Sequence, residues 1–454
     1  MPEALPLALK EALTEKLAES LELPLPEATP RQLHGAIGLP GKATAVVGMR
    51  RTGKTTFVHQ LRRQRLAADA ARTHLPYLNF EDERLAGLSG RQLGFLLEEF
   101  GRRVPDVPEG RRVTWCFDEI QLVPDWERFV RRLLDKGGIE VVVTGSSAAL
   151  LSREIATALR GRAWEVPLYP FSFGEALRHR AEAVPADPGF LTGAARARIE
   201  RAFLGWLDAG GFPEAQGLDA GARGQLLRDY VDVAMLRDVV ERHGVSNVIG
   251  LRWLVRHLLS NAAGLFSVEK FYAALKSQGI AISKDTVHQL LGYLEDCFLV
   301  RVVWMESVSE RQRMVNPRKT YPVDAGFIPL FDRSGRGNIG HALETAVLIE
   351  LERRRFAVTY VRTPGGREVD FLARGPEGDL ELIQVCADAS DPATADRELR
   401  ALVEAGEVHP RARKRLLTLT RDGTPAEPPP GVIVQPAYEW MLATADDGGP
   451  ESGD

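Results

Sequence analysis

Cysteine is scarce in this chain: only three occur among 454 residues, and none shows CxxC spacing. Cys116, Cys297 and Cys386 lie in separate apolar runs. We therefore expect reduced core residues rather than a disulfide framework or a zinc site. Long apolar runs are also missing, because none approaches the roughly 18 residues that span a bilayer. The N-terminus lacks a signal-peptide pattern, so we expect a cytoplasmic protein that makes no membrane contact.

The chain has no large excess of either charge. Its 58 Lys and Arg residues against 62 Asp and Glu leave a formal net charge of −4. A surface for nucleic acid would therefore have to be local. The content of 44% hydrophobic and 26% charged residues is that of an ordinary globular protein, and the length predicts two to four domains.

A strand-like run at 44–47 leads directly into GMRRTGKTT at 48–56, which matches the phosphate-loop pattern GxxxxGK[ST] and precedes a helical pattern. The glycines let backbone N–H groups point into one concavity, at which the helix directs its positive end. Lys54 can then reach the β- and γ-phosphates, and the Thr55 hydroxyl can ligate Mg²⁺. We predict a site for ATP and Mg²⁺ formed by Gly48, Arg51, Thr52, Gly53, Lys54, Thr55 and Thr56.

Two acidic residues complete the predicted site. The apolar strand-like run at 113–117 ends in Asp118 and Glu119. Carboxylates at such a strand end hold Mg²⁺, directly or through water, and polarise the attacking water. We assign the first role to Asp118 and the second to Glu119. An acidic pair alone is a weak signal, but together with an upstream phosphate loop it is a strong one.

A third strand-like run, at 139–143, ends in TGSS at 144–147. A polar side chain at this place commonly senses the γ-phosphate or orients the water, and Thr144 and Ser146 are the candidates. Capping of the following helix is the alternative for both. Further on, LRGR at 159–162 offers an arginine that could stabilise the transition state, in cis or from a neighbouring subunit. Most such arginines are solvated surface residues, so the residues alone leave Arg160 and Arg162 open.

The order of these motifs resembles a prokaryotic family of AAA-type ATPases with a long C-terminal part that ends in a nuclease-like domain. YLNFEDERL at 77–85, PLYPFSFGE at 167–175 and GGFPE at 210–214 also look like that family. The resemblance runs from about residue 30 to about residue 420. By that resemblance Arg162 is the better candidate for the arginine finger. The predicted catalytic residues are then Lys54, Glu119, Ser146 and Arg162. We expect a homo-oligomer, for which a hexamer is one candidate.

We predict an α/β fold: a P-loop NTPase core of AAA type with a helical lid, a winged-helix domain and a C-terminal α/β nuclease-like domain. The chain divides into an N-terminal helix and connector (1–35), the ATPase core (36–165), the lid (166–240), the winged helix (241–330), the nuclease-like domain (335–420) and a tail (421–454). We expect the acidic, Gly-rich end of the tail to be disordered.

Two helical patterns at 268–277 and 284–295, joined by a Gly-containing turn with Ser283 as N-cap, have the spacing of a helix-turn-helix. Strand-like runs at 298–305 and 318–323, joined by 306–313, would add a wing. Residues 241–320 hold 11 Lys and Arg against 7 Asp and Glu. We predict DNA contacts, with a protein-interaction module or rigid spacer as the alternative. The predicted contacts are Lys284, Thr286, His288, Gln289, Arg311, Arg313, Arg318 and Lys319.

The order helix, strand, strand, strand over 343–386 resembles the PD-(D/E)xK nuclease core, in which carboxylates hold Mg²⁺ and a lysine helps to activate water. Glu344 and Asp370 match that pattern. Gln384 and Cys386 stand where the second carboxylate and the lysine belong, and neither an amide nor a thiol replaces those groups. We therefore expect a degenerate site in a domain that holds DNA or serves as a scaffold.

Together these expectations describe an ATP-hydrolysing, oligomeric AAA-type motor or switch that binds DNA. By analogy with junction resolvases, branched or junction DNA is the expected form. The alternative is a signalling ATPase in which the nucleotide state controls assembly and the C-terminal half binds a protein partner.

Overall fold

The structure is a computed structural model that describes residues 5–68, 70–105, 107, 112–146, 159, 161–332 and 338–443. Its chain forms two compact units. The first comprises the chain up to Arg31, Gly35–Leu168 and Asp296–Phe298. The second comprises Gln32–His34, Tyr169–Glu295 and the chain from Leu299 onward. Among the described residues, no helix is both long and apolar enough to cross a membrane.

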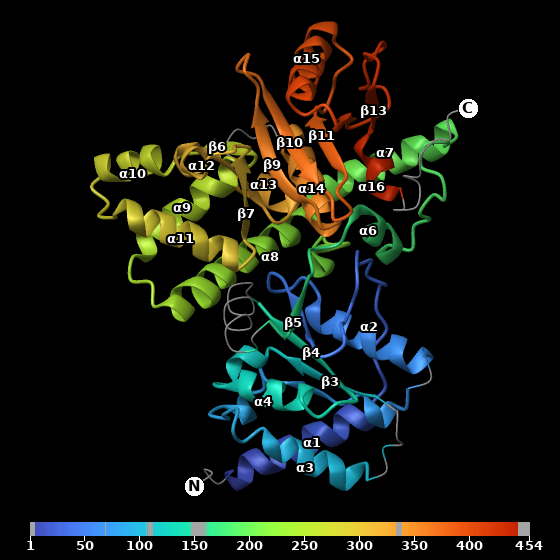
Figure 1. Cartoon of the computed structure of the whole chain (residues 1–454), viewed down its shortest axis with the longest axis vertical. Coiled ribbons are helices and arrows are strands. Elements are labelled where there is room, and N and C mark those ends of the chain that lie inside the picture. Colours follow the sequence, from blue (N-terminus) through green and yellow to red (C-terminus); the bar gives the residue numbers. More distant parts are fainter. Residues whose placement is uncertain are drawn as a thin grey trace. The chain divides into compact units, whose positions relative to one another are not determined.

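The first unit is built on a five-stranded parallel sheet with the order β2-β3-β4-β1-β5 (Figure 1). Buried runs such as Ala43–Val47 and Val113–Asp118 suit a parallel sheet that helices cover on its faces. The strands predicted at 44–47, 113–117 and 139–143 are confirmed. The strands are β1 (Ala43–Val47), β2 (Tyr77–Asn79), β3 (Val113–Asp118), β4 (Ile139–Gly145) and β5 (Ala163–Pro167). The helices are α1 (Leu7–Glu22), α2 (Lys54–Ala67), α3 (Gly94–Arg103) and α4 (Trp126–Leu134).

The second unit contains an eight-stranded mixed sheet with the order β13-β12-β11-β10-β9-β7-β8-β6 (Figure 1). Its strands are β6 (Gly264–Phe266), β7 (Val300–Met305), β8 (Arg318–Pro322), β9 (Ala357–Arg362), β10 (Glu368–Arg374), β11 (Leu380–Val385), β12 (Arg413–Thr418) and β13 (Val432–Pro436). Its helices are α6 (Phe173–His179), α7 (Gly193–Ala209), α8 (Ala220–Val233), α9 (Val248–Ser260), α10 (Val268–Ser277), α11 (Lys284–Asp296), α12 (Glu310–Val315), α13 (Ile328–Phe331), α14 (Ile339–Arg353), α15 (Pro392–Val408) and α16 (Ala437–Leu442).

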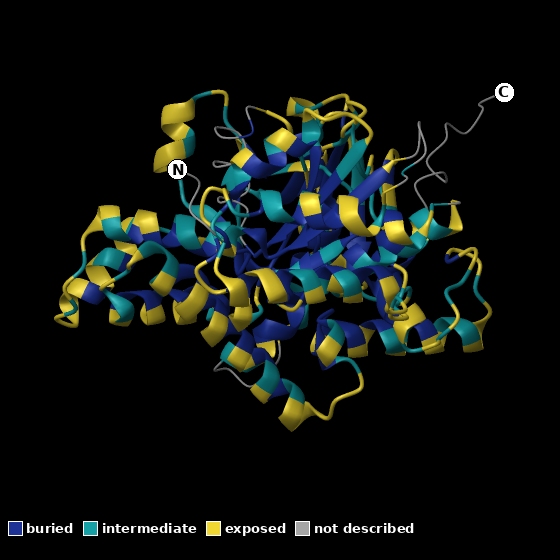
Figure 2. Ribbon diagram, turned by 90° about the horizontal axis from the view of Figure 1, so that it is seen from below, coloured by how far each residue is buried: buried dark blue, intermediate teal, exposed yellow. Residues whose placement is uncertain are grey.

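Helices cover both faces of the C-terminal strands. Consecutive strand residues point to opposite faces. Phe371 and Ile383 therefore join the core around α14, whereas Leu372 and Leu382 join the core under α15. Figure 2 shows buried residues along the strands and on the inner sides of the helices. These two cores hold the strands that carry the predicted Asp370 and Gln384.

The boundary predicted between 330 and 335 does not separate two sheets. β7 pairs antiparallel with β8 over Val300–Val303, and its last two residues pair in parallel with Thr359 and Tyr360 of β9. The strands expected to form a wing and the strands expected to form a nuclease-like core therefore belong to one sheet. This continuity brings residues of β8 close to residues of β10.

Two local predictions are wrong. The joining segment 306–313 was expected to be a wing loop, but Glu310–Val315 forms α12, capped by Ser309, whose hydroxyl accepts a hydrogen bond from the Gln312 N–H. The tail was expected to begin at 421, yet β13 and α16 are part of the fold, because α16 buries Tyr438 and Trp440 in the core around α14. The disorder predicted for 446–454 lies outside the described residues.

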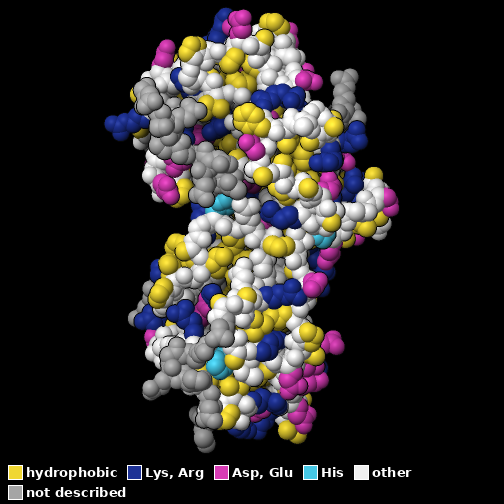
Figure 3. All heavy atoms as spheres, turned by 90° about the vertical axis from the view of Figure 1, so that its right-hand side faces the viewer, with side chains coloured by type: hydrophobic (Ala, Val, Ile, Leu, Met, Phe, Trp, Pro, Cys, Tyr) yellow, Lys and Arg dark blue, Asp and Glu magenta, His cyan; other side chains and the backbone are white. Residues whose placement is uncertain are grey.

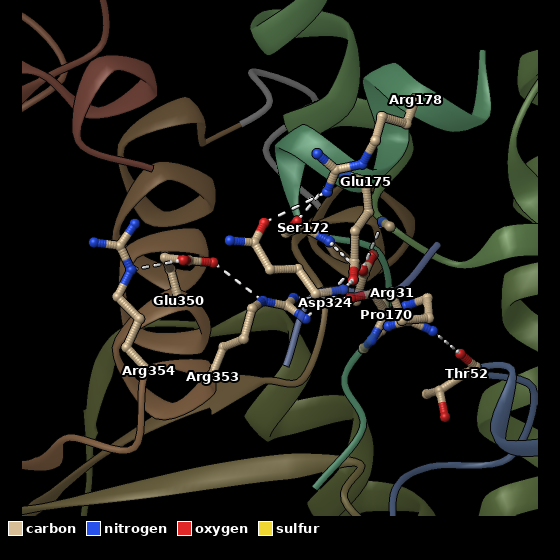
Figure 4. A network of polar contacts seen from close by, with 12 residues as sticks. Arg31, Thr52, Pro170, Ser172, Glu175, Arg178, Asp324, Glu350, Arg353 and Arg354 are labelled. Atoms are coloured by element: carbon tan, nitrogen blue, oxygen red, sulfur yellow. Dashed lines mark hydrogen bonds and ion pairs between the residues drawn. The ribbon is translucent and has the colours of Figure 1, made fainter. Parts of the chain in front are cut away.

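The segments 169–175 and 210–214 form a polar junction within the second unit (Figure 4). Asp324 accepts the Gly211 N–H at 2.7 Å and the Gly326 N–H at 2.9 Å. Gly210 ends α7 with φ +77°, and a Cβ there would lie 1.8 Å from Asp324 Oδ1. Burial raises the pKa of Asp324 to about 6, although both N–H groups favour its carboxylate form. These glycines are therefore required by packing.

Buried charges complete this junction. Ser172 and Glu175 form a capping box at the start of α6, and the Glu175 side chain also accepts the Gln32 N–H at 2.6 Å. Arg353 donates to the Pro170 carbonyl at 2.8 Å and to Glu350 at 3.1 Å (Figure 4). Since buried polar groups need partners, this network fixes the ends of α6 and α14 relative to each other.

Candidate nucleotide site and C-terminal carboxylate cluster

The phosphate loop joins the end of β1 to the start of α2. A Cβ at Gly48 would lie 2.3 Å from the Leu168 carbonyl oxygen, so a side chain cannot fit there. Gly53 adopts φ +94° at the N-cap of α2, a conformation that favours glycine. Inside the loop, the Thr52 hydroxyl donates to the Met49 carbonyl at 2.9 Å. Arg31 donates to the Thr52 carbonyl at 2.8 Å, which fixes the loop from outside.

Lys54 is buried, and its ammonium lies within the loop. The Nζ atom donates to the carbonyls of Gly48 and Met49, at 3.1 Å each, and lies 3.8 Å from Glu119 Oε1. The predicted loop lysine and the predicted water-orienting carboxylate are therefore brought together. Arg51, Thr55 and Thr56 are exposed on the loop and on the first turn of α2.

Asp118 is fully buried and lies at the centre of the site. Its Oδ2 accepts hydrogen bonds from the Thr55 hydroxyl at 2.7 Å and the Tyr77 hydroxyl at 2.8 Å. Its Oδ1 accepts the hydroxyl of Thr144. The two predicted Mg²⁺ ligands, Thr55 and Asp118, are thus direct neighbours. The sequence reasoning missed Tyr77, which begins β2; the parallel pairing of β2 with β3 places it beside Asp118.

Glu119 adopts φ +52°, a strained conformation for a residue other than glycine. Its N–H donates to the Thr144 hydroxyl at 2.9 Å, and its Oε2 accepts Gln121 Nε2 at 2.5 Å. Thr144 therefore contacts both acidic residues. Of the two residues proposed for this strand end, Thr144 fits the sensing role by contact, and Ser146 is buried two residues further on. The sequence analysis also missed Gln121, although it lies only two residues after Glu119.

The polar groups of this site fit a nucleoside triphosphate with Mg²⁺. The glycine positions leave room for backbone N–H groups to approach an anion, and the N-terminus of a 14-residue helix faces the same place. Lys54 supplies a cation. A hydroxyl and a carboxylate, from Thr55 and Asp118, supply the oxygen ligands that Mg²⁺ prefers.

Two neighbouring groups have shifted pKa values. Burial and the adjacent Asp118 carboxylate raise the pKa of Tyr77, so its hydroxyl remains a donor. Burial, with help from Arg62 and Arg72, lowers the pKa of His59 to about 4. The His59 ring packs 4.5 Å from the Tyr77 ring, and Arg62 Nη1 lies 3.1 Å from His59 Nδ1. Because a guanidinium only donates, Nδ1 is the acceptor and the imidazole is neutral.

Arg162 does not approach the phosphate loop of its own chain. It lies one residue before β5, and its carbonyl accepts the N–H of Ala43, the first residue of β1. The phosphate loop follows the C-terminal end of β1, whereas Arg162 lies beside its N-terminal end. The loop and Arg162 therefore lie at opposite ends of the parallel strands. The Arg162 guanidinium is 45% exposed and pairs with Asp135. Arg160 lies outside the described residues.

A second polar cluster, the C-terminal carboxylate cluster, consists of Lys319, Tyr321, Glu344, Glu368 and Asp370. Lys319 Nζ contacts Glu344 Oε1 at 2.9 Å, Asp370 Oδ1 at 2.9 Å and Glu368 Oε1 at 2.8 Å. Lys319 is only 3% exposed. Its predicted contact with DNA is therefore wrong, because the side chain points into the core.

The structure brings Glu344 and Asp370 together, as predicted, and places Gln384 beside the Asp370 backbone, whereas the Cys386 thiol contacts Asp388 instead. Gln384 accepts the Asp370 N–H at 3.2 Å and donates to Glu398 at 2.7 Å. Cys386 is half-buried and donates to the Asp388 carbonyl. Glu368 and Asp370 are two residues apart on one strand, and Lys319 and Tyr321 are two residues apart on another. Because residues i and i+2 point to the same face of a strand, this spacing was a signal in the sequence that could have revealed the cluster. Among the described residues, no three His, Cys, Asp or Glu side chains are arranged to hold a metal ion as they stand, and this includes the three carboxylates around Lys319.

The other predicted DNA contacts lie nearer the surface. Lys284, His288, Gln289 and Arg311 are exposed, whereas Thr286, Arg313 and Arg318 are half-buried. Lys284 pairs with Glu269 at 2.5 Å, and the Arg318 guanidinium lies 3.9 Å from the centre of the Trp304 ring. On the face drawn in Figure 3, Lys and Arg side chains are interspersed with Asp and Glu. Since the formal net charge of the chain is −4, a nucleic-acid surface would have to be local.

This fold and site define an ATPase of the AAA type, and the model for an AAA domain matches residues 40–177. A domain of unknown function (DUF8612) matches 201–333. The chain belongs to the same family as the uncharacterized protein MJ1544 of Methanocaldococcus jannaschii. The two are 33% identical over 372 residues, which cover 81% of this chain and 79% of the relative. An uncharacterized protein of Haemophilus influenzae is 29% identical over 341 residues, or 75% of this chain and 81% of the relative.

Solved structures of similar ATPases are more distant. The Walker-type ATPase PABY2304 of Pyrococcus abyssi is 16% identical with a TM-score of 0.40, over 71% of this chain and 95% of that one. The Aeropyrum pernix ORC1 protein, solved in complex with DNA, is 17% identical with a TM-score of 0.28, over 73% of this chain and 93% of that one.

Proposed function

We propose that this chain is an ATP-hydrolysing AAA-type motor or switch that works as a homo-oligomer and binds DNA through its second unit. The observation that carries the ATPase proposal is the meeting of Lys54, Thr55, Asp118 and Glu119 at one phosphate loop. The Thr55 hydroxyl donates a 2.7 Å hydrogen bond to Asp118, and Lys54 forms a 3.8 Å ion pair with Glu119.

Each residue has a distinct part in hydrolysis. Lys54 binds the β- and γ-phosphates, and Thr55 with Asp118 would hold Mg²⁺, which when bound neutralises charge on the phosphates. Glu119 orients the attacking water and accepts its proton. Thr144 keeps both acidic residues in place through one hydroxyl, which accepts from the Glu119 N–H and donates to Asp118.

The DNA proposal depends on α10, α11 and strands β6–β8. The two helices have the predicted bounds, and the Ser283 hydroxyl accepts the Thr286 N–H at 3.0 Å at the start of α11. Lys284, His288 and Gln289 are exposed on α11, as the second helix of a winged helix would require for contacts in the major groove. Lys319 is no longer proposed as a DNA contact, because it is buried. Arg311, Arg313 and Arg318 remain proposed DNA contacts.

The remaining assignments are proposals at the scale of domains. Of the proposed lid, 166–240, the residues from Tyr169 onward are mostly helical, as expected, and belong to the second compact unit. The nuclease-like core, proposed for 335–420, would extend through α16. Branched or junction DNA remains the proposed ligand by analogy alone.

The ATPase assignment is tested by two substitutions. Glu119→Gln should bind ATP but hydrolyse it at least about a hundredfold more slowly, because the base is lost while the loop remains. Lys54→Ala should instead weaken ATP binding itself. Nucleotide affinity and steady-state phosphate release, measured for both variants, separate these effects, and wild-type turnover in Glu119→Gln would refute the assignment.

The DNA assignment is tested by charge reversal at Lys284 and Arg311, with binding measured on duplex, forked and four-way DNA. The double variant should lose about tenfold in affinity and show a weaker salt dependence, because phosphate contacts release counterions. Arg201→Glu, at an exposed position of α7, matches the type of charge change and should bind like wild type. Equal DNA affinity in all three proteins, or no binding by any of them, would refute a DNA role for α11.

A specific observation favours the second candidate, a nucleotide-gated ATPase whose C-terminal half binds a protein. α12 buries none of its residues, and Met314 and Val315 are 69% and 76% exposed. Trp253, Leu265 and Phe271 line a nearby pocket of about 390 Å³ in the same unit. Exposed apolar side chains of this kind mark protein-binding surfaces. Absence of DNA binding, together with nucleotide-dependent capture of a protein that Met314→Asp abolishes, would select this candidate.

A further inference from the structure

The C-terminal carboxylate cluster contains an ammonium that the sequence motif does not predict. Lys319 extends from β8, and its Nζ lies 2.8–2.9 Å from one oxygen of each of three carboxylates, on α14 and β10. β8 is separated from β10 by two strands in the sheet order, but β7 pairs with β9 only at its last two residues. The sheet therefore lets β8 deliver a lysine to the face that carries Asp370.

The carboxylates of Glu344 and Asp370, which contact Lys319, also accept hydrogen bonds from other donors. Glu344 Oε1 also accepts the Tyr321 hydroxyl at 2.7 Å, and the second oxygen of Asp370 accepts the Val385 N–H at 3.0 Å. Lys319 Nζ is therefore the point on which the three carboxylate side chains converge.

We propose that the Lys319 ammonium is the resident cation of this cluster, in the place that a divalent metal ion would otherwise take between Glu344, Glu368 and Asp370. The wild-type cluster therefore binds no metal ion and has no metal-dependent nuclease activity. The reason differs from the one given by the sequence, in which Cys386 leaves the site without an ammonium. Here the ammonium is present, but it lies among the carboxylates themselves.

Charge supports this arrangement. The buried carboxylates of Glu344 and Asp370 and the half-buried carboxylate of Glu368 would repel one another without a cation and would carry a desolvation cost, which one ammonium with three ion pairs reduces. With Lys319 removed, a divalent cation with oxygen ligands is the group that best satisfies the same carboxylates. The proposal concerns a cluster within the second unit and does not depend on the ATPase assignment.

The test is Mn²⁺ binding to the full-length protein without nucleotide, measured by calorimetry and by electron paramagnetic resonance of free Mn²⁺. All proteins carry Thr55→Ala, so that the phosphate loop contributes no ligand. The otherwise wild-type protein should show no Mn²⁺ site that depends on Asp370. Lys319→Met, which keeps the length of the side chain, should gain one site with at least about tenfold tighter binding, and added Mn²⁺ should raise its Tm.

Two controls decide the origin of any gained site. Lys319→Met with Asp370→Asn should lose it, and Arg301→Met, which removes a buried charge paired with Glu352 in the same unit, should gain none. If Lys319→Met does not fold, Lys319→Met with Glu344→Gln removes one carboxylate charge and gives the same comparison. Mn²⁺ binding or DNA nicking by wild type that Asp370→Asn abolishes would overturn the proposal. So would a folded Lys319 variant that gains no site.

Discussion

At the scale of single residues, Asp118 is fixed by three hydroxyl groups from three different elements. Thr55 comes from α2, Tyr77 from β2 and Thr144 from β4. An ionised carboxylate accepts about four hydrogen bonds, so three of its positions are occupied by donors of defined direction. The orientation of this proposed Mg²⁺ ligand is therefore set by the fold, which is the arrangement that precise catalysis requires.

Tyr77→Phe tests this arrangement because it removes one donor and keeps the ring against His59. A hydrogen bond to a charged group contributes about 1.5–3 kcal/mol, so a less strictly oriented Asp118 should lower kcat about tenfold. The Mg²⁺ concentration needed for half-maximal hydrolysis should also rise. Thermal unfolding serves as the control: the lost hydrogen bond should lower the Tm, but the protein should remain folded at the assay temperature. An unchanged kcat with an unchanged Mg²⁺ dependence would show that Tyr77 has no part in positioning Asp118.

His59 predicts an acid-sensitive contribution to stability. Its pKa is lowered from 6.5 in the unfolded chain to about 4 in the fold, so the unfolded state binds the proton first as pH falls. The contribution is present above the unfolded value and is lost between about pH 6.5 and about pH 4. His59→Gln should therefore weaken the fall in the free energy of unfolding over that range, measured by urea denaturation. The same pH slope in both proteins would contradict it.

Sequence predicts residues well where the chemistry is local, and poorly where distant segments meet. Lys54 and Thr55 follow from one spacing within nine residues, and the loop geometry agrees. Lys319 was assigned to a DNA-binding wing because it lies in a basic stretch, and only the packing of β8 shows that it is buried. Tyr77 gave no signal of its own, since its contact with Asp118 spans 41 positions.

At the scale of secondary-structure elements, the end of α7 depends on close backbone approach. Gly210 ends this helix with positive φ, and the next N–H is accepted by Asp324. A glycine at this helix end avoids the strain that a side chain would suffer at φ +77° and ψ −177°. Because Asp324 also accepts the Gly326 N–H, one carboxylate joins the end of α7 to the segment that follows β8.

Gly210→Ala should destabilise the protein by about 3 kcal/mol, because the backbone at φ +77° and ψ −177° is open essentially only to glycine, at a cost of about 1–3 kcal/mol, and the new Cβ would meet Asp324. Gly205→Ala is the matched control on the same helix, since a Cβ at that position would have no atom of the described residues within 4 Å beyond its own helix backbone and chain neighbours. That change should be neutral or should stabilise by up to about 1 kcal/mol. Urea unfolding of both variants measures the difference, and equal stabilities would refute the packing argument.

Element predictions held where hydrophobic periodicity was clear. The helices at 268–277 and 284–295 and the strands of the ATPase core have nearly the expected bounds. The tail was misjudged because its Pro-rich stretch suggested that the fold had ended, while the apolar residues after it form β13 and α16. α12 was missed because its residues bury nothing, so no apolar face was visible in the sequence. The Ser309 cap was the available signal.

At the scale of the whole molecule, the fold class of the ATPase core follows from sequence, but the larger sheet does not. Strands β6 to β8 join β9 to β13 through only two residue pairs of β7 and β9. Such pairing between strands separated by more than fifty residues has no local signature, since the same alternation would suit an independent winged helix. The carboxylate cluster depends on this joining, which is why sequence alone gave an incomplete set of residues.

Arg162 sets the expectation for assembly. Arg162 lies beside the N-terminal end of β1, and its own phosphate loop follows the C-terminal end. A finger role therefore requires a phosphate loop on a neighbouring subunit. Head-to-tail interfaces of this kind place different surfaces of two identical chains together. The Arg162 side chain is 45% exposed, so it is accessible to a partner.

Arg162→Ala and Lys54→Ala should each abolish most ATP hydrolysis, and mixing the two proteins should restore part of it. In a random mixture, about a quarter of the interfaces pair an intact loop with an intact finger. Arg128→Ala removes an exposed arginine of α4 and should hydrolyse ATP like wild type. A mixture of Lys54→Ala with a protein carrying both substitutions should stay inactive, because neither subunit then has an intact loop. If co-purification of differently tagged subunits proves that mixed oligomers form and hydrolysis still does not recover, Arg162 does not act across the interface.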